Sequence, residues 1–171
     1  MKNNLYCTVL LIFYVSTATC AFAGQDVPEG FRDIQWETDI KDLTGMTPLP
    51  NSQDNERHYS KKDDPLRMEN AAVESVIYGF YKDKFFMGVV AFQSYKNFAL
   101  IKEQLEHRFG TARETSADRL VWDWPKVKMI LYYDQKKESG NVTYYYQPLL
   151  KQKFVDQRIK QKKARASHYV E

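Results

Sequence analysis

The sequence predicts an α+β fold: a single domain in which an antiparallel meander sheet of about five to six strands packs against a central amphipathic helix, with a further helix at the C-terminus. Three observations predict this fold. Two β-rich runs between residues 73 and 92 are separated by a short polar turn, residues 95–109 place apolar side chains at helical spacing, and three alternating runs follow between residues 120 and 146. The 171 residues leave room for one domain of ordinary size.

The first 23 residues indicate a targeting segment rather than a part of the fold. Lys2 precedes an apolar run from Leu5 to Val15, and small residues lead to the ending Ala21-Phe22-Ala23. This order is typical of a secretory signal peptide that is cleaved before Gly24. The apolar run is shorter than the roughly 20 residues that a membrane-spanning helix needs. We therefore expect an exported protein of the periplasm, with no membrane span once the signal peptide is removed.

Both cysteines of the chain, Cys7 and Cys20, lie within this segment. The mature chain is then free of cysteine, so it can form neither a disulfide nor a thiolate metal site. An alternative is a lipid anchor on Cys20, although Thr17-Ala18-Thr19 lacks the aliphatic residue that usually stands three positions before a lipidated cysteine. The expected divisions of the chain are a signal peptide (1–23), an α+β domain (24–150) and a basic C-terminal helix end or tail (151–171).

The first part of the mature chain predicts little regular structure. Thr38 is the expected N-cap of a short helix, because acidic residues follow in its first turn, and Gly45 is the expected end of that helix. Proline residues then indicate a loop that reaches residue 55. Residues 58–62 predict a short edge strand, and residues 63–70 predict a connection.

The strongest patterns lie in the middle of the chain. Bulky residues alternate over 73–81, and a short polar turn leads to a second β-rich run at 85–92, which predicts a hairpin. Residues 95–109 predict an amphipathic helix that ends at Gly110. The apolar stripe of that helix consists of Phe98, Ile101, Leu105 and Phe109.

Three further strands and a helix complete the predicted domain. Strands at 120–124, 127–133 and 142–146 are joined by short turns, the second of them at Gly140-Asn141, and connections this short join antiparallel neighbours. Pro148 favours the first turn of a helix over 149–163. The far end of this helix is wholly polar, so we expect it to fray or to project.

Charge is distributed unevenly along the chain. Without Lys2, 24 basic and 22 acidic side chains give a formal charge of +2. Residues 151–171 have a charge of +5, and residues 24–150 therefore have a charge of −3. A solvated helix end is one explanation, and contact with an anionic surface is the other. The candidate contacts to such a surface are Lys151, Lys153, Arg158, Lys160, Lys162, Lys163 and Arg165.

The sequence contains no assembled catalytic or metal-binding motif. The three histidines, at positions 58, 107 and 168, stand in separate segments, and no glycine-rich phosphate loop or G-x-S-x-G turn occurs. We therefore predict no catalytic residue, no metal site and no cofactor, and interpret the protein as non-enzymatic. The alternative is a hydrolase whose site is assembled from distant loops, with Asp63, Asp64 and His58 as the first candidates.

Aromatic residues make up 15% of the chain and suggest a second kind of site. Trp122 and Trp124 share a face of one predicted strand, and we expect Tyr132, Tyr144 and Tyr146 to join them from neighbouring strands. Packing in the core is the simpler explanation, because aromatic residues favour strands. The alternative is an aromatic face that holds a small ligand, which would make the protein a carrier.

The mature opening from Phe31 to Thr38 resembles the F-x-x-I-x-W-x-T phrase of small uncharacterised exported proteins of Gram-negative bacteria. The hairpin phrase at 76–85 and the helix-to-glycine phrase at 105–110 are similar to the same group. The order of hairpin, helix and further strands also resembles β-lactamase-inhibitor-like domains and small outer-membrane-assembly lipoprotein domains. These resemblances imply a location in the cell envelope and supply no catalytic residues.

Together, these patterns favour a non-enzymatic exported domain that binds a protein or an envelope component. The sheet and the basic tail are the two surfaces suggested for that contact. Aromatic rings beside a basic tail are also features of nucleic-acid binding, but export makes nucleic acid the less accessible partner.

Overall fold

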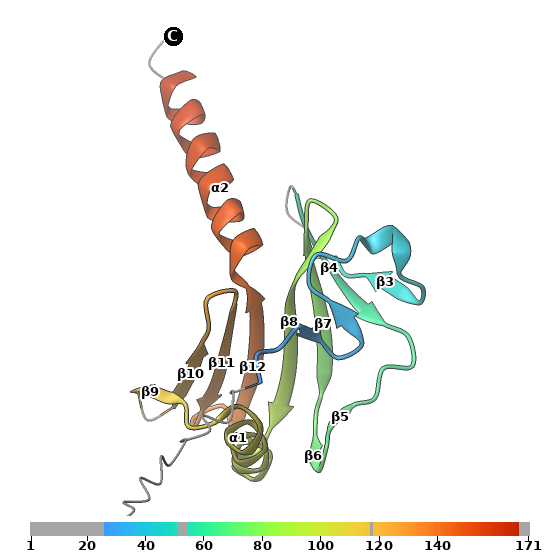
Figure 1. Ribbon diagram of the computed structural model, residues 1–171, viewed down its shortest axis with the longest axis vertical. Helices are drawn as coiled ribbons and strands as arrows, with labels where there is room; N and C mark the ends of the chain where they lie inside the picture. The colour runs from blue at the N-terminus through green and yellow to red at the C-terminus, as the bar shows by residue number, and fades with distance from the viewer. Residues whose placement is uncertain (1–25, 51–54, 117, 168–171) are drawn as a thin grey trace, which may run out of the picture.

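The computed structural model describes residues 26–50, 55–116 and 118–167, and its centre is one large antiparallel sheet (Figure 1). Eight strands form this sheet in the order β3-β4-β7-β8-β12-β11-β10-β9. Their bounds are β3 Met46–Pro48, β4 Glu56–Lys61, β7 Ser75–Tyr81, β8 Lys84–Gln93, β9 Arg113–Ser116, β10 Arg119–Asp123, β11 Val127–Asp134 and β12 Ser139–Tyr146. The predicted signal peptide and both cysteines lie outside the described residues.

Two small strand pairs and three helical segments surround the sheet. The first pair joins β1 (Gly30–Phe31) to β2 (Ile34–Gln35), and the second joins β5 (Arg67–Met68) to β6 (Ala71–Ala72). The helical segments are the 3-10 turn η1 (Ile40–Asp42), helix α1 (Tyr95–Phe109) and helix α2 (Gln147–Ser167).

The α+β class, the antiparallel sheet and the C-terminal helix are confirmed, but two parts of the predicted architecture are wrong. The sheet has eight strands rather than five to six, and its first helix is not central. Residues 46–48, predicted as a loop, pair with β4, so β4 is an inner strand and not the edge strand expected at 58–62. All four side chains of β9 are exposed. This strand joins the sheet through backbone hydrogen bonds, so its sequence shows no alternation of apolar and polar residues.

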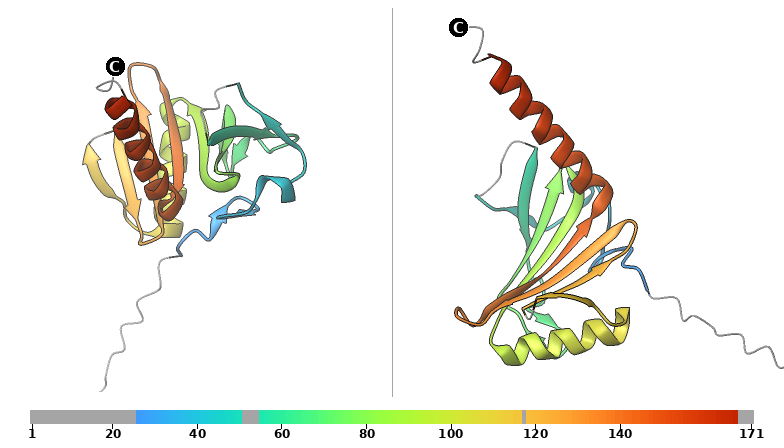
Figure 2. Two further views of the ribbon diagram at one scale, coloured as in Figure 1. Left: turned by 90° about the horizontal axis from the view of Figure 1, so that it is seen from above. Right: turned by 90° about the vertical axis from the view of Figure 1, so that its left-hand side faces the viewer.

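Helix α1 crosses one end of the sheet instead of covering its middle (Figures 1 and 2). Ser94 caps its N-terminus by accepting a hydrogen bond from the Asn97 N–H, and Gly110 follows its last residue with a φ of 78°, as predicted. The apolar stripe of α1 is buried against the sheet. One such stripe covers only part of a sheet this wide, so other segments must cover the rest of the same face, called the α1 face below.

The N-terminal segment covers the middle of the α1 face. Figure 1 shows residues 26–36, in blue, crossing in front of β12 and β8. The ring centroid of Phe31 lies 5.5 Å from that of Tyr78 and 5.1 Å from that of Tyr144. Gly88 permits this close approach, because a Cβ at that position would collide with the Phe31 ring. The segment is thus fixed to the sheet by aromatic packing over a glycine.

Helix α2 begins directly after β12. Its first turns pack on the sheet, and the rest of the helix projects from it (Figures 1 and 2). Asp156 accepts a 2.7 Å hydrogen bond from the Tyr81 hydroxyl and lies 2.6 Å from the Lys82 ammonium. Lys153 forms an ion pair with Glu56 of β4. These contacts hold the start of α2 against β4 and the β7–β8 hairpin. Within the described ranges, neither α1 nor α2 combines the length and apolar character that a bilayer-spanning helix requires.

Two local predictions are wrong. Asp39, and not Thr38, caps the short helical turn, because the Asp39 carboxylate accepts the N–H of residue 41. The turn between β11 and β12 comprises residues 135–138, whereas Gly140 lies inside β12. A Cβ at Gly140 would meet the ring of Phe92, so this glycine serves close packing within the sheet rather than a turn.

Candidate functional site

Four of the five aromatic residues predicted as a ligand face lie on the α1 face. Trp122 and Tyr144 stand opposite the same residue of β11, Met129, and therefore point to the same side of the sheet. Trp124 and Tyr146 follow two residues later and share that side. Trp122, Tyr144 and Tyr146 are only 4%, 6% and 9% exposed. They pack beneath α1 and the N-terminal segment, and form no open platform.

Tyr132 does not join these residues. Its side chain is 40% exposed on the opposite face, because side chains alternate along β11 and the buried Leu131 and Tyr133 flank it. The predicted face is therefore divided between the two sides of the sheet. Core packing accounts for most of the aromatic residues that the sequence singled out.

The three residues suggested for a hydrolase site are not brought together. His58 stands opposite Gly79 in the sheet, whereas Asp64 accepts a 2.8 Å hydrogen bond from the hydroxyl of Tyr78. Neighbouring residues of a strand point to opposite faces, so His58 and Asp64 lie on opposite sides of the sheet. Asp63 is exposed in the connection that follows β4. This geometry supplies no catalytic arrangement of the three.

All seven basic residues predicted as anionic-surface contacts lie on α2. Lys153 differs from the others, because it pairs with Glu56 and lies 5.5 Å above the ring of Phe86. Its role is therefore to hold the start of α2 against the sheet. No acidic residue follows Asp156 before the end of α2, so all the charged residues in the projecting part of the helix are basic.

Four of these residues form a line along α2, called the basic row below. They recur at intervals of seven, four and three residues, which places them on the side of the helix opposite Lys153 and Asp156. The apolar residues Phe154, Val155 and Ile159 flank the row and are 51%, 53% and 48% exposed. The basic row consists of Lys151, Arg158, Lys162 and Arg165, all of them exposed.

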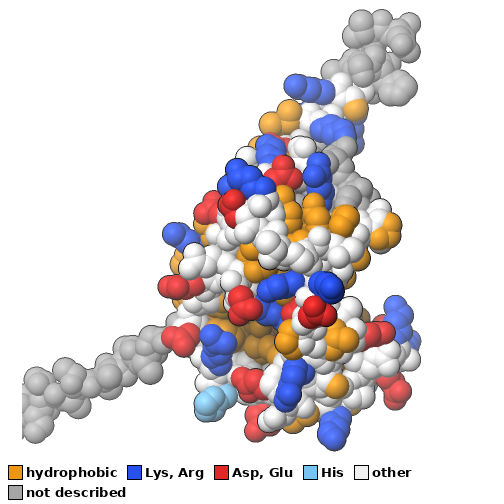
Figure 3. Space-filling model, turned by 90° about the vertical axis from the view of Figure 1, so that its right-hand side faces the viewer, with side chains coloured by type: hydrophobic (Ala, Val, Ile, Leu, Met, Phe, Trp, Pro, Cys, Tyr) orange, Lys and Arg blue, Asp and Glu red, His pale blue; other side chains and the backbone are white. Residues whose placement is uncertain are grey.

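A groove of about 1220 Å³ opens between the N-terminal segment and the C-terminal end of α1. Residues of β8, β11 and β12 also line it. Figure 3 shows hydrophobic side chains within a hollow on this side of the molecule, with charged side chains of both signs around it. The aromatic lining consists of Phe31, Trp36, Phe109, Tyr144 and Tyr146.

Tyr144 supplies a polar group to the lining of this groove. Its side chain is 6% exposed, and its hydroxyl makes no hydrogen bond to another described residue. Burial raises the pKa of the Tyr144 hydroxyl, and the positive charges of Arg108 and Arg32 partly oppose that rise. Both charged side chains that affect the pKa of this hydroxyl are therefore cations.

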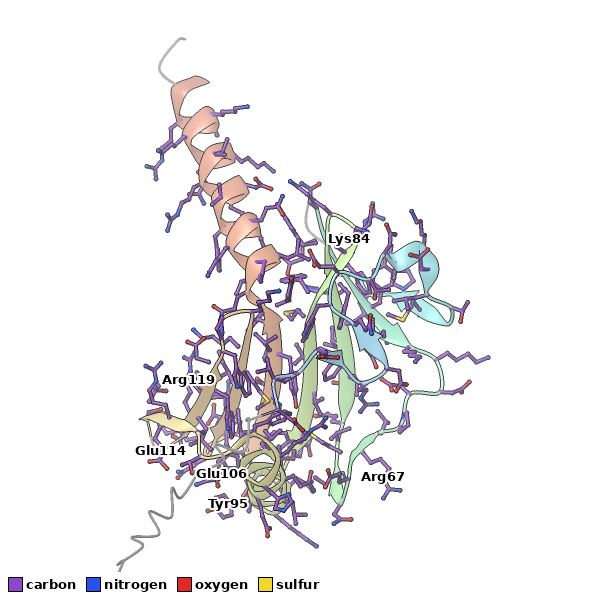
Figure 4. All side chains as sticks on the ribbon, in the orientation of Figure 1. Arg67, Lys84, Tyr95, Glu106, Glu114 and Arg119 are labelled. Carbon is purple, nitrogen blue, oxygen red and sulfur yellow. The ribbon has the colours of Figure 1, made fainter. Side chains whose placement is uncertain are left out.

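The cations around the groove differ in whether the protein already satisfies them. Arg32 is paired with Asp64, and Arg67, labelled in Figure 4, donates to a backbone carbonyl oxygen at 3.1 Å. Arg108 lies 5.1 Å from the centroid of a phenylalanine ring. Neither Arg108 nor Lys126 forms an ion pair with any part of the chain that the structure describes. These two cations remain available to an anionic ligand.

The sequence did not predict this groove. Its lining comes from the N-terminal segment, β5, the end of α1, the turn before β11 and the C-terminal end of β12. Of its polar groups, only those of Tyr144 and Tyr146 belonged to a predicted site. Arg108 and Lys126 follow no motif, and only the folded arrangement brings them to the same groove.

A second hollow, of about 450 Å³, lies beside α1 and has four acidic residues among the eleven of its lining. Glu106 and Glu114, both labelled in Figure 4, lie on this lining, and Lys102 stands 3.9 Å from Glu114. The described residues include no group of three or more histidine, cysteine, aspartate or glutamate side chains arranged to hold a metal ion.

The basic row and the groove beside Tyr144 are therefore the two surfaces on which a functional argument can rest. The resemblance of residues 31–38 to exported proteins of Gram-negative bacteria stays a prediction. Comparisons with protein-family models, with curated proteins and with solved structures find no match for this chain.

Proposed function

We propose that this chain is a non-enzymatic, exported binding domain that attaches to an anionic membrane surface through α2. The observation that supports it is the basic row, which lies on a helix that projects from the sheet and exposes apolar side chains beside its cations. Export rests on the predicted signal peptide, whereas the surface contact rests on the helix itself.

The arrangement of α2 matches the chemistry of a bilayer interface. Phe154 lies on one side of the basic row, and Val155 and Ile159 lie on the other. Lysine and arginine side chains extend their apolar stems along such residues and place their charged ends among lipid phosphates. The helix therefore offers both shallow apolar contacts and positive charge on the same side.

The expected strength of this contact is moderate. A cation close to an anionic leaflet contributes about 1 kcal/mol, so the four residues of the basic row contribute roughly 4 kcal/mol. Attachment of this strength is reversible and weakens as salt screens the charges. The charge of −3 on residues 24–150 disfavours approach by the body of the domain and so favours binding through α2.

Sedimentation with vesicles tests this proposal. The variant Lys151→Gln/Arg158→Gln/Lys162→Gln/Arg165→Gln keeps good helix formers and removes the basic row. We expect the wild-type protein to sediment with vesicles that contain phosphatidylglycerol and not with pure phosphatidylcholine. We expect the variant to bind at least about tenfold more weakly, because it lacks four charges of this kind.

A matched control removes four exposed cations from the body of the domain: Lys96→Gln/Arg113→Gln/Arg119→Gln/Lys136→Gln. This control changes the net charge by the same amount and should keep most of its binding. Equal losses in both variants would show that only the total charge matters and would refute a specific role for α2. If the wild-type protein ignores anionic vesicles even at low salt, the membrane is excluded and an acidic protein becomes the partner to test.

A further inference from the structure

We propose that the groove between the N-terminal segment and α1 binds an amphipathic carboxylate, a fatty-acid-like anion whose charged end meets Tyr144 and Arg108 and whose apolar body lies along the aromatic walls. This site is separate from the basic row, and the inference does not depend on membrane attachment.

The hydroxyl of Tyr144 is the hydrogen-bond donor of the site. This hydroxyl makes no hydrogen bond to a described residue and is not one of the fully buried polar atoms that lack a partner, so it is open to a molecule in the groove. A tyrosine hydroxyl is protonated at neutral pH, and burial raises the pKa of Tyr144 further, so the hydroxyl can donate. A ligand oxygen that enters the groove can accept a hydrogen bond from this hydroxyl, and a carboxylate is a stronger acceptor than a neutral oxygen.

The charges around the hydroxyl favour an anion over a cation. Arg108 and Arg32 are the charged groups that act on Tyr144. Of the acidic groups that line the groove, Glu37 accepts a 3.1 Å hydrogen bond from Tyr146, and Asp33 lies 3.8 Å from Lys61 with its side chain 90% exposed. The other acidic residues of the lining are Asp26, Glu29 and Glu69, all exposed. Every acidic residue of the lining is thus exposed, whereas the side chain of Arg32 is only 19% exposed.

The walls of the groove suit an extended apolar body. Trp36 stacks on Tyr146 at 6.0 Å with an interplanar angle of 12°, which gives a flat and rigid wall. Phe31 and Phe109 add apolar surface on the same groove. Its volume of about 1220 Å³ exceeds the roughly 300–1,000 Å³ of a typical small-molecule pocket. An extended alkyl chain can lie along such an open groove and contact several of its aromatic side chains at once.

Calorimetric titration of the full chain with three twelve-carbon probes tests the charge preference. The probes are dodecanoate, dodecanol and dodecyltrimethylammonium, each kept below its micelle concentration. We expect dodecanoate to bind at least about tenfold more tightly than the other two, because only dodecanoate pairs with Tyr144 and Arg108. Quenching of tryptophan fluorescence should accompany binding, since Trp36 lines the groove.

Two substitutions test the residues themselves. Tyr144→Phe removes only the hydroxyl, and Arg108→Gln removes the cation; we expect each to weaken dodecanoate binding by about tenfold. The matched controls are Tyr133→Phe, at a buried tyrosine outside the groove, and Arg113→Gln, at an exposed arginine outside it. Tyr144→Phe should fold about as stably as the wild type, because it removes a hydroxyl that makes no hydrogen bond to a described residue.

Three results would overturn the proposal: no binding of dodecanoate, equal binding of all three probes, or unchanged binding in both groove variants. The variant without the basic row supplies the remaining arm of the experiment. Unchanged dodecanoate binding in that variant supports the groove as the site. Loss of dodecanoate binding there would assign the ligand to α2 and reject the groove.

Discussion

A single glycine sets the position of the N-terminal segment. Gly88 leaves room on β8 for the ring of Phe31, which in turn contacts Tyr144 at a centroid distance of 5.1 Å. In Gly88→Ala, the new methyl group enters the space of that ring, and overpacking of this kind costs about 1–3 kcal/mol. We expect urea unfolding to show a loss of this size in the free energy of unfolding. Dodecanoate binding should weaken as well, because Phe31 is a wall of the groove.

The matched control for this change is Gly79→Ala, on the neighbouring strand β7. A Cβ at Gly79 would meet the terminal methyl group of Met87 at 2.7 Å, and a methionine side chain can move aside. The loss of stability should therefore be smaller than for Gly88→Ala, with no effect on the ligand. Equal losses in the two variants would show that any side chain weakens these strands, and would remove Phe31 from the explanation.

At the scale of secondary structure, the start of α2 is held by a carboxylate whose charge depends on pH. The Lys82 ammonium, and then the Tyr81 hydroxyl, hold the pKa of Asp156 below its ordinary value of 3.8. A carboxylate with a depressed pKa in the folded state stabilises that state above its unfolded pKa, and the contribution is lost as pH falls through the folded pKa. The attachment of α2 should therefore be complete above about pH 4 and weaken below it.

Hydrogen exchange of the first turns of α2 checks this prediction. It is followed from about pH 6 down to about pH 3, roughly the range in which carboxylates titrate, and is corrected for the intrinsic exchange rates. Wild-type protection should decrease at the acid end, and Asp156→Asn should start with low protection and change less. Asp83→Asn removes a carboxylate from the same hairpin and controls for net charge; Asp83 pairs with Arg57 rather than with α2. An acid response of Asp156→Asn as large as that of the wild type would contradict the prediction.

The elements that the sequence predicted well are those whose side chains face two different environments. The alternation over β7, β8, β11 and β12, and the stripe of α1, reflect burial on a defined side, and the structure has each of them close to the expected residues. Strands β3 and β9 were missed for a physical reason. Each joins the sheet by backbone pairing with its side chains mostly exposed, so burial does not select an alternating pattern.

At the scale of the whole molecule, the basic row was predictable and the groove was not. The basic residues of α2 are neighbours in the sequence, and helical spacing alone places four of them on one side. The groove combines Arg32, Arg108, Lys126 and Tyr144, which are separated by up to 112 positions in the printed sequence. Only the path of the N-terminal segment across the sheet brings these residues together, and that path depends on packing at Gly88 rather than on any local pattern.

We predict that the projecting part of α2 can be removed without loss of the fold. None of the described residues after Leu149 belongs to the buried core, and the contacts of Lys153 and Asp156 lie at the start of the helix. A chain that ends after Asp156 keeps these contacts and removes three residues of the basic row. Changes at exposed positions usually alter stability by less than about 0.5 kcal/mol, so we expect nearly unchanged urea unfolding.

The same truncated chain should lose its attachment to phosphatidylglycerol vesicles while it keeps dodecanoate binding, because the residues that line the groove all precede α2. A truncation after Lys136 is no substitute as a control, since it would remove β12 from the middle of the sheet. The proper control is the fourfold substitution of the basic row, which keeps the whole helix. If the truncated chain unfolds much more easily than that variant, the far end of α2 stabilises the domain, and the membrane effect of the truncation would follow from unfolding rather than from lost charge.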